Sequence, residues 1–526
     1  MSSIAEPETE AKAEFRQWFG LAMLLLPTML MTADLGVLWL ATPDLVADLQ
    51  PTSAQLLWIT DSYGFLTAGF LVIMGTLGDR IGRRKLLMIG SLLFIAASLL
   101  AAYATSPDML IVGRGLLGIA GAAVLPSTLA LISTMFGNAR QRATAIAMWV
   151  TALSVGLGIG PVIGGVLLLE FWWGSVFLIG LPIMVLALAT APILLPEYRD
   201  PGAGRPDLPS VALFLLGILP IVYVVKAVAE HGFGTGTMLA LLVGVTAGVA
   251  FARRQYALDD PMIDIRLFGN RQFSAALATL LLGMMALNGV EYIVPQFLQL
   301  VGETSPLAAA LWLLPGAAGL LVGSQLTPIL TRVLRPAYVI AGGQLVALIG
   351  FATTFLAADG QSGVVLAALG LTLIMFGVAP ISVLCTGIAV SSAPPQQAGA
   401  AAGAGQTSYD LGLALGIAVV GSASVALYRS QVAANLPSNT PAGVDAAAQD
   451  TLGSAIAAAH TLPQPLSGQL TAVARDAFIS GFHGAAVFGA ALAAVVAVLA
   501  LTLLRDIPAT PKTRADASDD AVAARP

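Results

Sequence analysis

The chain has 526 residues, of which 57% are hydrophobic and only 10% are charged, and its formal net charge is −5. So much apolar surface cannot be buried in one soluble core, so the composition predicts a polytopic membrane protein. The basic face that nucleic-acid binding requires is absent, and the single cysteine, Cys385, has no partner for a disulfide within the chain.

Fourteen apolar segments are long enough, at roughly twenty residues each, to cross a bilayer as helices. The preceding segment 1–16 lacks the basic start and cleavage site of a signal peptide, so the first apolar segment is expected to remain as a helix. Basic loop residues fall on one side, with only Arg429 and Arg475 outside it, which predicts cytoplasmic termini. The segments are 17–41, 53–76, 84–104, 107–133, 141–168, 173–195, 209–229, 236–253, 271–300, 307–331, 337–358, 362–390, 397–428 and 478–504.

The first segment carries Asp34 about midway along an otherwise apolar run. A charged group at that depth costs roughly 2.5–3.5 kcal/mol to insert unless it is paired or hydrated. A carboxyl group there is suited to take up a proton on one side of the membrane and release it on the other. The alternative is a structural partner for Arg114 in the fourth segment, and such a pair is also compatible with proton coupling.

A short charged stretch, Gly75 to Lys85, joins the second and third segments. Five of its eleven residues are charged, and its glycines let two helix ends approach closely where the chain reverses. Because basic residues gather on cytoplasmic loops, this turn is predicted to lie inside and to orient every later crossing.

The fifth segment carries a face of small residues, formed by Gly156, Gly160, Gly164 and the adjacent Gly165. A neighbouring helix can approach such a face closely, and Pro161 removes a backbone hydrogen bond and permits a bend. The pattern is suited to a helix that slides or rocks.

The chain divides at proline-rich and polar connections. The predicted order is a bundle at 17–195, a linker at 196–208, two inserted helices at 209–253, a linker at 254–270 and a second bundle at 271–504. The outer connection 429–479 is expected to hold two short helices, at 444–459 and 468–478, as a hairpin, the alternative being a loose loop. The tail 505–526 is rich in Ala, Asp, Pro and Arg and is expected to be disordered.

Four further ionisable residues lie in the apolar segments, namely Asp61, Lys226, Glu291 and Asp410. Asp61 and Lys226 are expected near the outer ends, where a long side chain reaches the interface. Glu291 is interpreted as a cation site if its face turns to a central cavity, and as packing if it turns to the inserted helices.

Two of these patterns carry a family resemblance. The stretch Gly75-Thr-Leu-Gly-Asp-Arg-Ile-Gly-Arg-Arg-Lys85 resembles the helix 2–3 loop signature of the major facilitator superfamily, and Gly156 to Gly165 resembles its antiporter signature. Together with Leu57 to Tyr63, Arg114 to Ala122, Pro261 to Phe268 and Tyr409 to Gly412, they resemble the fourteen-helix drug:proton antiporters. The chain departs from that pattern at Gly405-Gln406-Thr407, where relatives carry acids.

The resemblance implies two six-helix bundles with two inserted helices. It also implies proton-driven efflux of lipophilic cations, such as quaternary ammonium compounds, biguanides and dyes, without a cofactor or metal. It implies a bacterial cytoplasmic-membrane protein that contacts lipids and acts as a monomer. The predicted roles are proton coupling by Asp34 and Arg114, an antiporter motif of Gly156, Gly160, Pro161, Gly164 and Gly165, and a conformational latch of Gly75, Asp79, Arg80, Gly82 and Arg83. The predicted substrate-binding residues are Asp34, Trp58, Asp61, Trp149, Glu291, Tyr409 and Asp410.

Two other classes stay open. A facilitator or exporter of a physiological metabolite or lipid shares the fold, because fold does not determine function; the buried acids argue against it. An enzyme would require clustered ligands, but His231, His460 and His483 show no ligand spacing. The chain contains no Gly-Lys-Ser or Gly-Lys-Thr, which excludes a P-loop ATPase within it.

Overall fold

The computed structural model describes residues 15–136, 138–197, 199, 207–258, 261, 265–394, 398–437 and 439–509. All the regular elements in these ranges are helical. They form two compact units, Met1–Leu216 with Ser305–Ala310, and Gly217–Thr304 with Leu311–Pro526. Segment 1–14 and most of the predicted tail lie outside the described residues.

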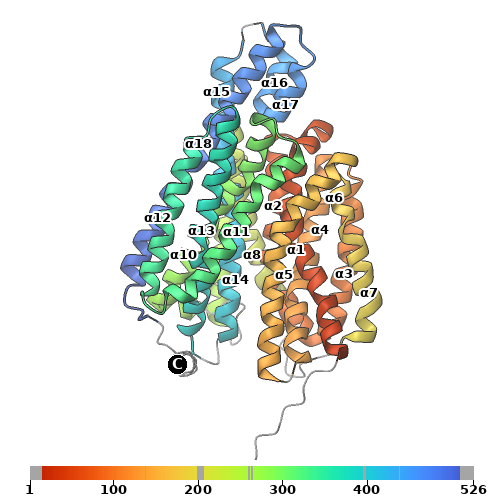
Figure 1. Cartoon of the computed structure of the whole chain (residues 1–526), viewed down its shortest axis with the longest axis vertical. Coiled ribbons are helices and arrows are strands. Elements are labelled where there is room, and N and C mark those ends of the chain that lie inside the picture. Colours follow the sequence, from red (N-terminus) through yellow and green to blue (C-terminus); the bar gives the residue numbers. More distant parts are fainter. Residues whose placement is uncertain are drawn as a thin grey trace, which may run out of the picture. The chain divides into compact units, whose positions relative to one another are not determined.

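The first unit contains seven complete helices within the described residues (Figure 1). The closest packing joins α1 to α5, and α4 to both α2 and α3. The helix α8 (Leu208–His231) begins in this unit and continues into the second. The bounds are α1 (Phe15–Leu49), α2 (Ser53–Ile81), α3 (Arg83–Ala102), α4 (Pro107–Met135), α5 (Ala139–Glu170), α6 (Ser175–Leu178) and α7 (Gly180–Leu194).

The second unit packs α12 against α13 and α18, and α10 against α13, α14 and α18. Two spans contain a π-helical turn, η2 after α10 and η4 between α14 and α15. The bounds are α9 (Thr235–Ala257), η1 (Ile265–Gly269), α10 (Arg271–Gln296), η2 (Phe297–Val301), α11 (Pro306–Leu330), α12 (Pro336–Phe355), α13 (Gln361–Ser391), α14 (Ala398–Leu415), η4 (Gly416–Gly421), α15 (Ser422–Asn435), α16 (Ala442–Asp450), α17 (Leu452–Ala459) and α18 (Leu466–Leu503).

The predicted multi-pass membrane fold is confirmed. Among the described residues, twelve helices are long and apolar enough to cross a membrane, and thirteen when the bent α1 is counted as one span. Each of the fourteen predicted segments overlaps a helix, but α2 is not among those thirteen. The count of fourteen spans and the division into bundles therefore stay predictions.

The first helix is longer than expected and bent. Its two parts, Phe15–Asp34 and Gly36–Leu49, meet at an angle of 42°. The bend therefore lies directly beside Asp34, the predicted proton carrier. A Cβ placed on Gly36 would lie 2.8 Å from the Pro161 ring of α5, so the two helices touch at the bend.

The outer connection contains a helical hairpin, but its helices differ from those expected. The predicted helix 444–459 is broken into α16 and α17 at Thr451, whose hydroxyl caps α17 by accepting a hydrogen bond from the Ser454 backbone. The predicted separate helix 468–478 is wrong, because it forms the first turns of the long α18. No proline follows Pro465 in this stretch, and its many alanines favour an uninterrupted helix.

The hairpin is anchored within its own unit (Figure 1). The buried Tyr428 hydroxyl of α15 donates to the Ala448 carbonyl of α16 over 2.7 Å. Arg429 lies 3.9 Å from Asp450, and α17 packs on α18. The hairpin is thereby attached to both α15 and α18.

Arginine side chains bind the C-terminal ends of two helices, α7 and α18. The last carbonyls of a helix have no partner within the helix, and its C-terminal end attracts positive charge. Arg16 donates to the Ile193 carbonyl and Arg84 to the Leu195 carbonyl at the end of α7, the latter over 3.1 Å. Arg271 and Arg335 donate to the Thr502 and Arg505 carbonyls at the end of α18, over 3.1 and 3.2 Å. We call these four side chains the arginine caps.

Candidate functional site

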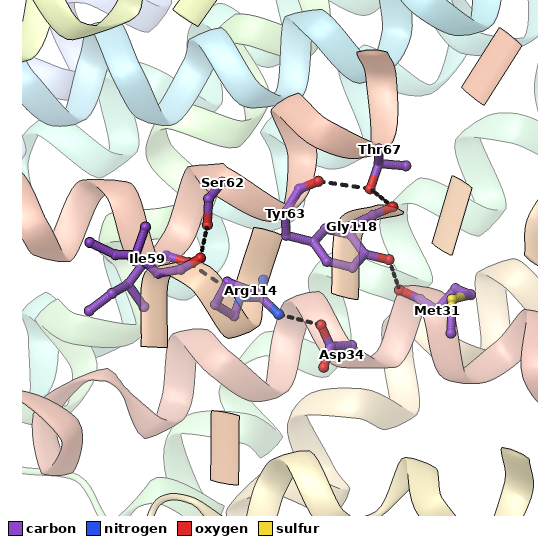
Figure 2. A network of polar contacts seen from close by, with 9 residues as sticks. Met31, Asp34, Ile59, Ser62, Tyr63, Thr67, Arg114 and Gly118 are labelled. Carbon is purple, nitrogen blue, oxygen red and sulfur yellow. Dashed lines mark hydrogen bonds and ion pairs between the residues drawn. The ribbon is translucent and has the colours of Figure 1, made fainter. Parts of the chain in front are cut away.

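Asp34 and Arg114 form a buried ion pair in the first unit. The Arg114 guanidinium is 0% exposed and the Asp34 side chain 8%, and Nη1 lies 2.5 Å from Oδ2 (Figure 2). The structure thus joins α1 to α4 through the two residues predicted for proton coupling. A charge pair removed from water in this way is costly to break, because either partner alone would be left uncompensated.

Aromatic rings surround the rest of the guanidinium. Its central carbon lies 4.8 Å from the centre of the Tyr63 ring and 5.9 Å from that of Phe177. Arg114 Nε donates to the Ile59 carbonyl over 3.2 Å, whereas Nη2 has no hydrogen-bond partner among the described residues. The Asp34 carboxylate, one carbonyl and two π faces therefore form its polar surroundings.

Close contact between α2 and α4 places Tyr63 beside Arg114. The Thr67 hydroxyl donates to the carbonyls of Tyr63 and Gly118, over 2.7 and 3.1 Å (Figure 2). A Cβ on Gly118 would collide with the Tyr63 carbonyl, so only glycine allows this approach. The Tyr63 hydroxyl is 3.5 Å from the Met31 carbonyl of α1.

The glycine face of α5 packs against the part of α1 that carries Asp34. A Cβ on Gly156 would meet the Met29 backbone, one on Gly160 would lie 2.5 Å from the Ala33 carbonyl oxygen, and one on Gly164 would lie 2.9 Å from the Val37 side chain. Gly165 faces Leu307 instead. The antiporter motif thus contacts both sides of the α1 bend.

Trp149 is held by a chain of hydroxyl groups. Its indole nitrogen donates to the Thr128 hydroxyl over 3.0 Å, and the Thr28 hydroxyl donates to the same atom over 3.3 Å. This predicted substrate-binding residue is half-buried and is fixed between α1, α4 and α5. The two other predicted residues of this unit lie on α2, where Trp58 is half-buried and Asp61 is buried.

A second set of acids lies in the second unit. Glu291 on α10 is only 7% exposed, and Asp410 on α14 accepts a hydrogen bond from the Gln406 amide over 3.0 Å. Tyr409 directly precedes Asp410 on α14 and is half-buried. Among the described residues, no basic side chain forms an ion pair with Glu291 or Asp410.

Small residues and one amide bring α10 and α14 together. The Asn288 amide, one turn before Glu291, donates to the Leu413 carbonyl over 2.7 Å. A Cβ on Gly412 would lie 2.5 Å from the Leu281 carbonyl oxygen, and one on Gly416 would lie 2.7 Å from that of Met285. Glu291 is therefore on a helix that packs against α14, which carries Tyr409 and Asp410. The side chain of Lys226 lies outside the described residues.

The predicted latch residues lie where α2 meets α3, with Gly75, Asp79 and Arg80 in the last turns of α2, Gly82 between the helices and Arg83 at the start of α3. The stretch predicted to connect the two helices is therefore helical except at Gly82. Asp79 pairs with Arg83 over 2.5 Å, Gly82 has a φ of +113° that disfavours any side chain, and Arg80 is exposed. Gly75 has open space around it.

Three residues of these sites were not predicted to act there. Glu197 accepts a hydrogen bond from the Arg84 backbone over 3.2 Å and so ties the end of α7 to the α2–α3 turn. Tyr63 and Phe177 flank Arg114. Tyr63 is four residues after Ile59, which places both on one helix face, but aromatic residues are too common in apolar helices for this spacing to identify a site.

Comparisons with known proteins agree with this architecture. A family model described as Major Facilitator Superfamily matches residues 24–417. The chain is 37% identical over 487 residues to the multidrug efflux pump LfrA of Mycolicibacterium smegmatis, covering 92% of this chain and 96% of that protein. It is 35% identical over 477 residues to the methyl viologen resistance protein SmvA of Salmonella typhimurium, covering 88% and 94%.

A solved structure has a similar fold. It is a bacterial homologue of the human lysosomal transporter Spinster in an inward-facing and unoccupied conformation, with a TM-score of 0.68 over 94% of this chain and 99% of that one. The sequence identity of 16% makes this a likeness of fold alone.

Proposed function

Because this chain belongs to the major facilitator superfamily, we propose that it is a proton-coupled antiporter that exports lipophilic cations. Membership of this superfamily makes it a multi-pass membrane transporter rather than an enzyme. Efflux is supported by the relatives, which include a multidrug efflux pump and a methyl viologen resistance protein. The proposed substrates are quaternary ammonium compounds, biguanides and planar dyes such as ethidium.

One observation carries the cationic substrate class, namely that two sets of acids in apolar helices differ in their partners. Asp34 already has the Arg114 guanidinium as its counter-charge, whereas the described residues give Glu291 and Asp410 no basic partner. An acid in a membrane helix without a counter-charge is stabilised either by a proton or by a bound cation. We therefore assign Glu291, Tyr409 and Asp410 to the cation and Asp34 with Arg114 to the proton.

The predicted aromatic residues of each unit also favour organic cations. The faces of Trp and Tyr rings attract cations, and Trp149, Trp58 and Tyr409 are half-buried. Asp61 on α2 adds a further acid. This combination of acids with aromatic faces suits organic cations better than neutral metabolites.

The exchange cycle follows from two units that alternate access around a shared path. Binding of a cation stabilises ionised carboxylates and so favours proton release, while protonation on the other side of the membrane favours cation release. The membrane potential contributes about 2.3 kcal/mol per elementary charge for each 100 mV. Asp79 and its turn would act as the latch of one state, and the substrates and protons are the only small partners that the cycle requires.

The test is substrate-driven proton release from inverted membrane vesicles energised by respiration. Addition of ethidium should release protons from vesicles that contain the wild-type protein. Asp34→Asn should fold and reach the membrane yet abolish this release for every cation tested. Glu291→Gln should retain some release but require a higher ethidium concentration.

The proposal fails if ethidium releases no protons through the wild-type protein. Proton release by Asp34→Asn with wild-type amplitude would remove the coupling role from Asp34. A facilitator of a neutral metabolite or lipid predicts no response to cations in this assay, so the same experiment separates the two functions.

A further inference from the structure

Arg114 loses its negative partner in any cycle in which Asp34 takes up a proton. Its side chain is fully buried, and an arginine keeps its charge under all physiological conditions. Protonation of Asp34 removes the only carboxylate with which the described residues pair it. The guanidinium then needs other groups to stabilise its charge, or it has to move.

Two aromatic faces and a carbonyl lie where they can stabilise the charge of the guanidinium. Tyr63 and Phe177 lie 4.8 and 5.9 Å from the guanidinium carbon, within the range at which a ring face attracts a cation. Nε is bound to the Ile59 carbonyl over 3.2 Å. These groups stay in place when Asp34 gains or loses a proton, and they carry a larger share of the stabilisation of the guanidinium when the carboxylate has been neutralised.

Both rings are held by packing. Tyr63 is 4% exposed and Phe177 2%, and Gly118 contacts the Tyr63 backbone. The Tyr63 hydroxyl also lies 3.5 Å from the Met31 carbonyl. The attraction of a cation to a ring face needs the ring and not the hydroxyl, so a phenyl ring at position 63 should interact with Arg114 almost as tyrosine does.

We propose that Tyr63 and Phe177 are positioning residues that keep Arg114 in place while Asp34 is protonated. The carboxylate then finds its partner again when the proton leaves. This inference rests on the proposed role of Asp34 as proton carrier. It assigns a function in coupling to two side chains that carry no ionisable group in the physiological range.

The charged groups around Asp34 are few. Arg114 on α4 faces it, α2 contributes Asp61, and the facing parts of α5, α6 and α7 carry no charged side chain among the described residues. Asp61 is two positions from both Ile59 and Tyr63, which places it on the opposite face of α2 from the residues that contact Arg114. A change in pH dependence at position 63 or 177 is thus attributable to the Asp34–Arg114 pair.

The test measures initial rates of ethidium transport as a function of pH in liposomes reconstituted with purified protein. The variants are Tyr63→Phe, Tyr63→Leu and Phe177→Leu, and the control is Phe94→Leu, which removes a buried ring of the same unit that does not lie over the guanidinium. Loss of a ring face destabilises the state with protonated Asp34. Protonation then requires a higher proton concentration, so the pH profile should move to lower pH.

We expect a shift of about one pH unit for Tyr63→Leu, a smaller shift for Phe177→Leu, and none for Tyr63→Phe or Phe94→Leu. The inference is overturned if Tyr63→Leu keeps the wild-type profile, or if Tyr63→Phe shifts as far as Tyr63→Leu. If Tyr63→Leu does not fold, Phe177→Leu against Phe94→Leu decides. Wild-type protein and Asp34→Asn are measured alongside. If the wild-type rate does not depend on pH, both proton coupling and this inference are refuted. If the wild-type rate depends on pH and Tyr63→Leu has the same profile, only this inference is refuted.

Discussion

Asp410 differs from Asp34 in having an amide rather than a guanidinium as its partner. Gln406 donates one hydrogen bond to it, and no described basic residue neutralises its charge. With Glu291, it gives the second unit two acids within apolar helices. Two such charges are suited to a substrate that carries two positive charges.

We predict that Asp410→Asn weakens transport of dications more than that of monocations. The substitution retains the size of the side chain and removes its charge, so a dication should lose one of its two ionic partners. Minimum inhibitory concentrations of paired mono- and bis-quaternary compounds, measured in cells that express equal amounts of each variant, provide the comparison. Equal losses for the two classes would refute the assignment, and Gln406→Ala provides a control that leaves the charge intact.

Sequence reasoning found Asp34, Arg114, Glu291 and Asp410 because an ionisable group in an apolar segment is costly and therefore conspicuous. It offered a pair of Asp34 with Arg114 as one alternative but could not decide it, because the pairing depends on the packing of α1 against α4. Tyr63, Phe177 and Glu197 were missed for a related reason. Their roles come from neighbours far away in the chain, and nothing in their local sequence distinguishes them.

At the scale of elements, the contact of α5 with α1 is the feature closest to the proposed proton site. The glycines allow the two backbones to meet on both sides of the 42° bend beside Asp34. A helix that carries the proton site and bends there is therefore supported by a face that has no side chains to obstruct movement. This links the antiporter motif physically to the coupling residue.

We predict that Gly160→Ala reduces both stability and transport. Its Cβ would lie 2.5 Å from the Ala33 carbonyl oxygen, so one backbone has to move, at a cost of about 1–3 kcal/mol. Thermal melting in detergent and ethidium efflux measure the two effects. Gly342→Ala on α12, where a Cβ meets nothing within 4 Å, is the matched control and should melt at the wild-type temperature or slightly above it. Wild-type melting and efflux for Gly160→Ala would show that the close contact is not required.

Helix positions could be predicted from apolar length, whereas interruptions could not. The bend in α1, the π-helical turns η2 and η4, and the break at Thr451 all occur without a clear local signal. The predicted boundary at 478, between an outer helix and the last membrane segment, is wrong. An apolar pattern shows where a helix enters the membrane and not where the helix itself begins. An alanine-rich helix such as α18 continues beyond that point.

At the scale of the whole molecule, the chain forms two compact units, as an alternating-access cycle requires. The α2–α3 turn belongs to the first unit, where Asp79 pairs with Arg83. Glu197 ties the same turn to the end of α7. The turn is thus a rigid part of its unit and is suited to act as a latch.

We predict that Asp79→Asn slows transport while leaving dye affinity nearly unchanged. The substitution removes the ion pair with Arg83 and any charge-dependent docking of the turn, but it does not touch the proposed cation site. Turnover in liposomes and equilibrium binding of ethidium to purified protein separate the two effects. A large loss of dye affinity would move Asp79 into the binding site. Lys85→Gln, at an exposed position of the same turn, controls for a general loss of charge.

The arginine caps are relevant both to insertion of the chain into the membrane and to the folded protein. While the chain is being inserted, the positive charges of Arg16, Arg84, Arg271 and Arg335 favour retention of their segments on the predicted cytoplasmic side. After insertion, the same side chains seal the ends of α7 and α18. A segment inserted in the wrong direction would lose these bonds as well as misplace its charge. The orientation signal during insertion and the capping of α7 and α18 in the folded protein are therefore partly carried by the same four residues.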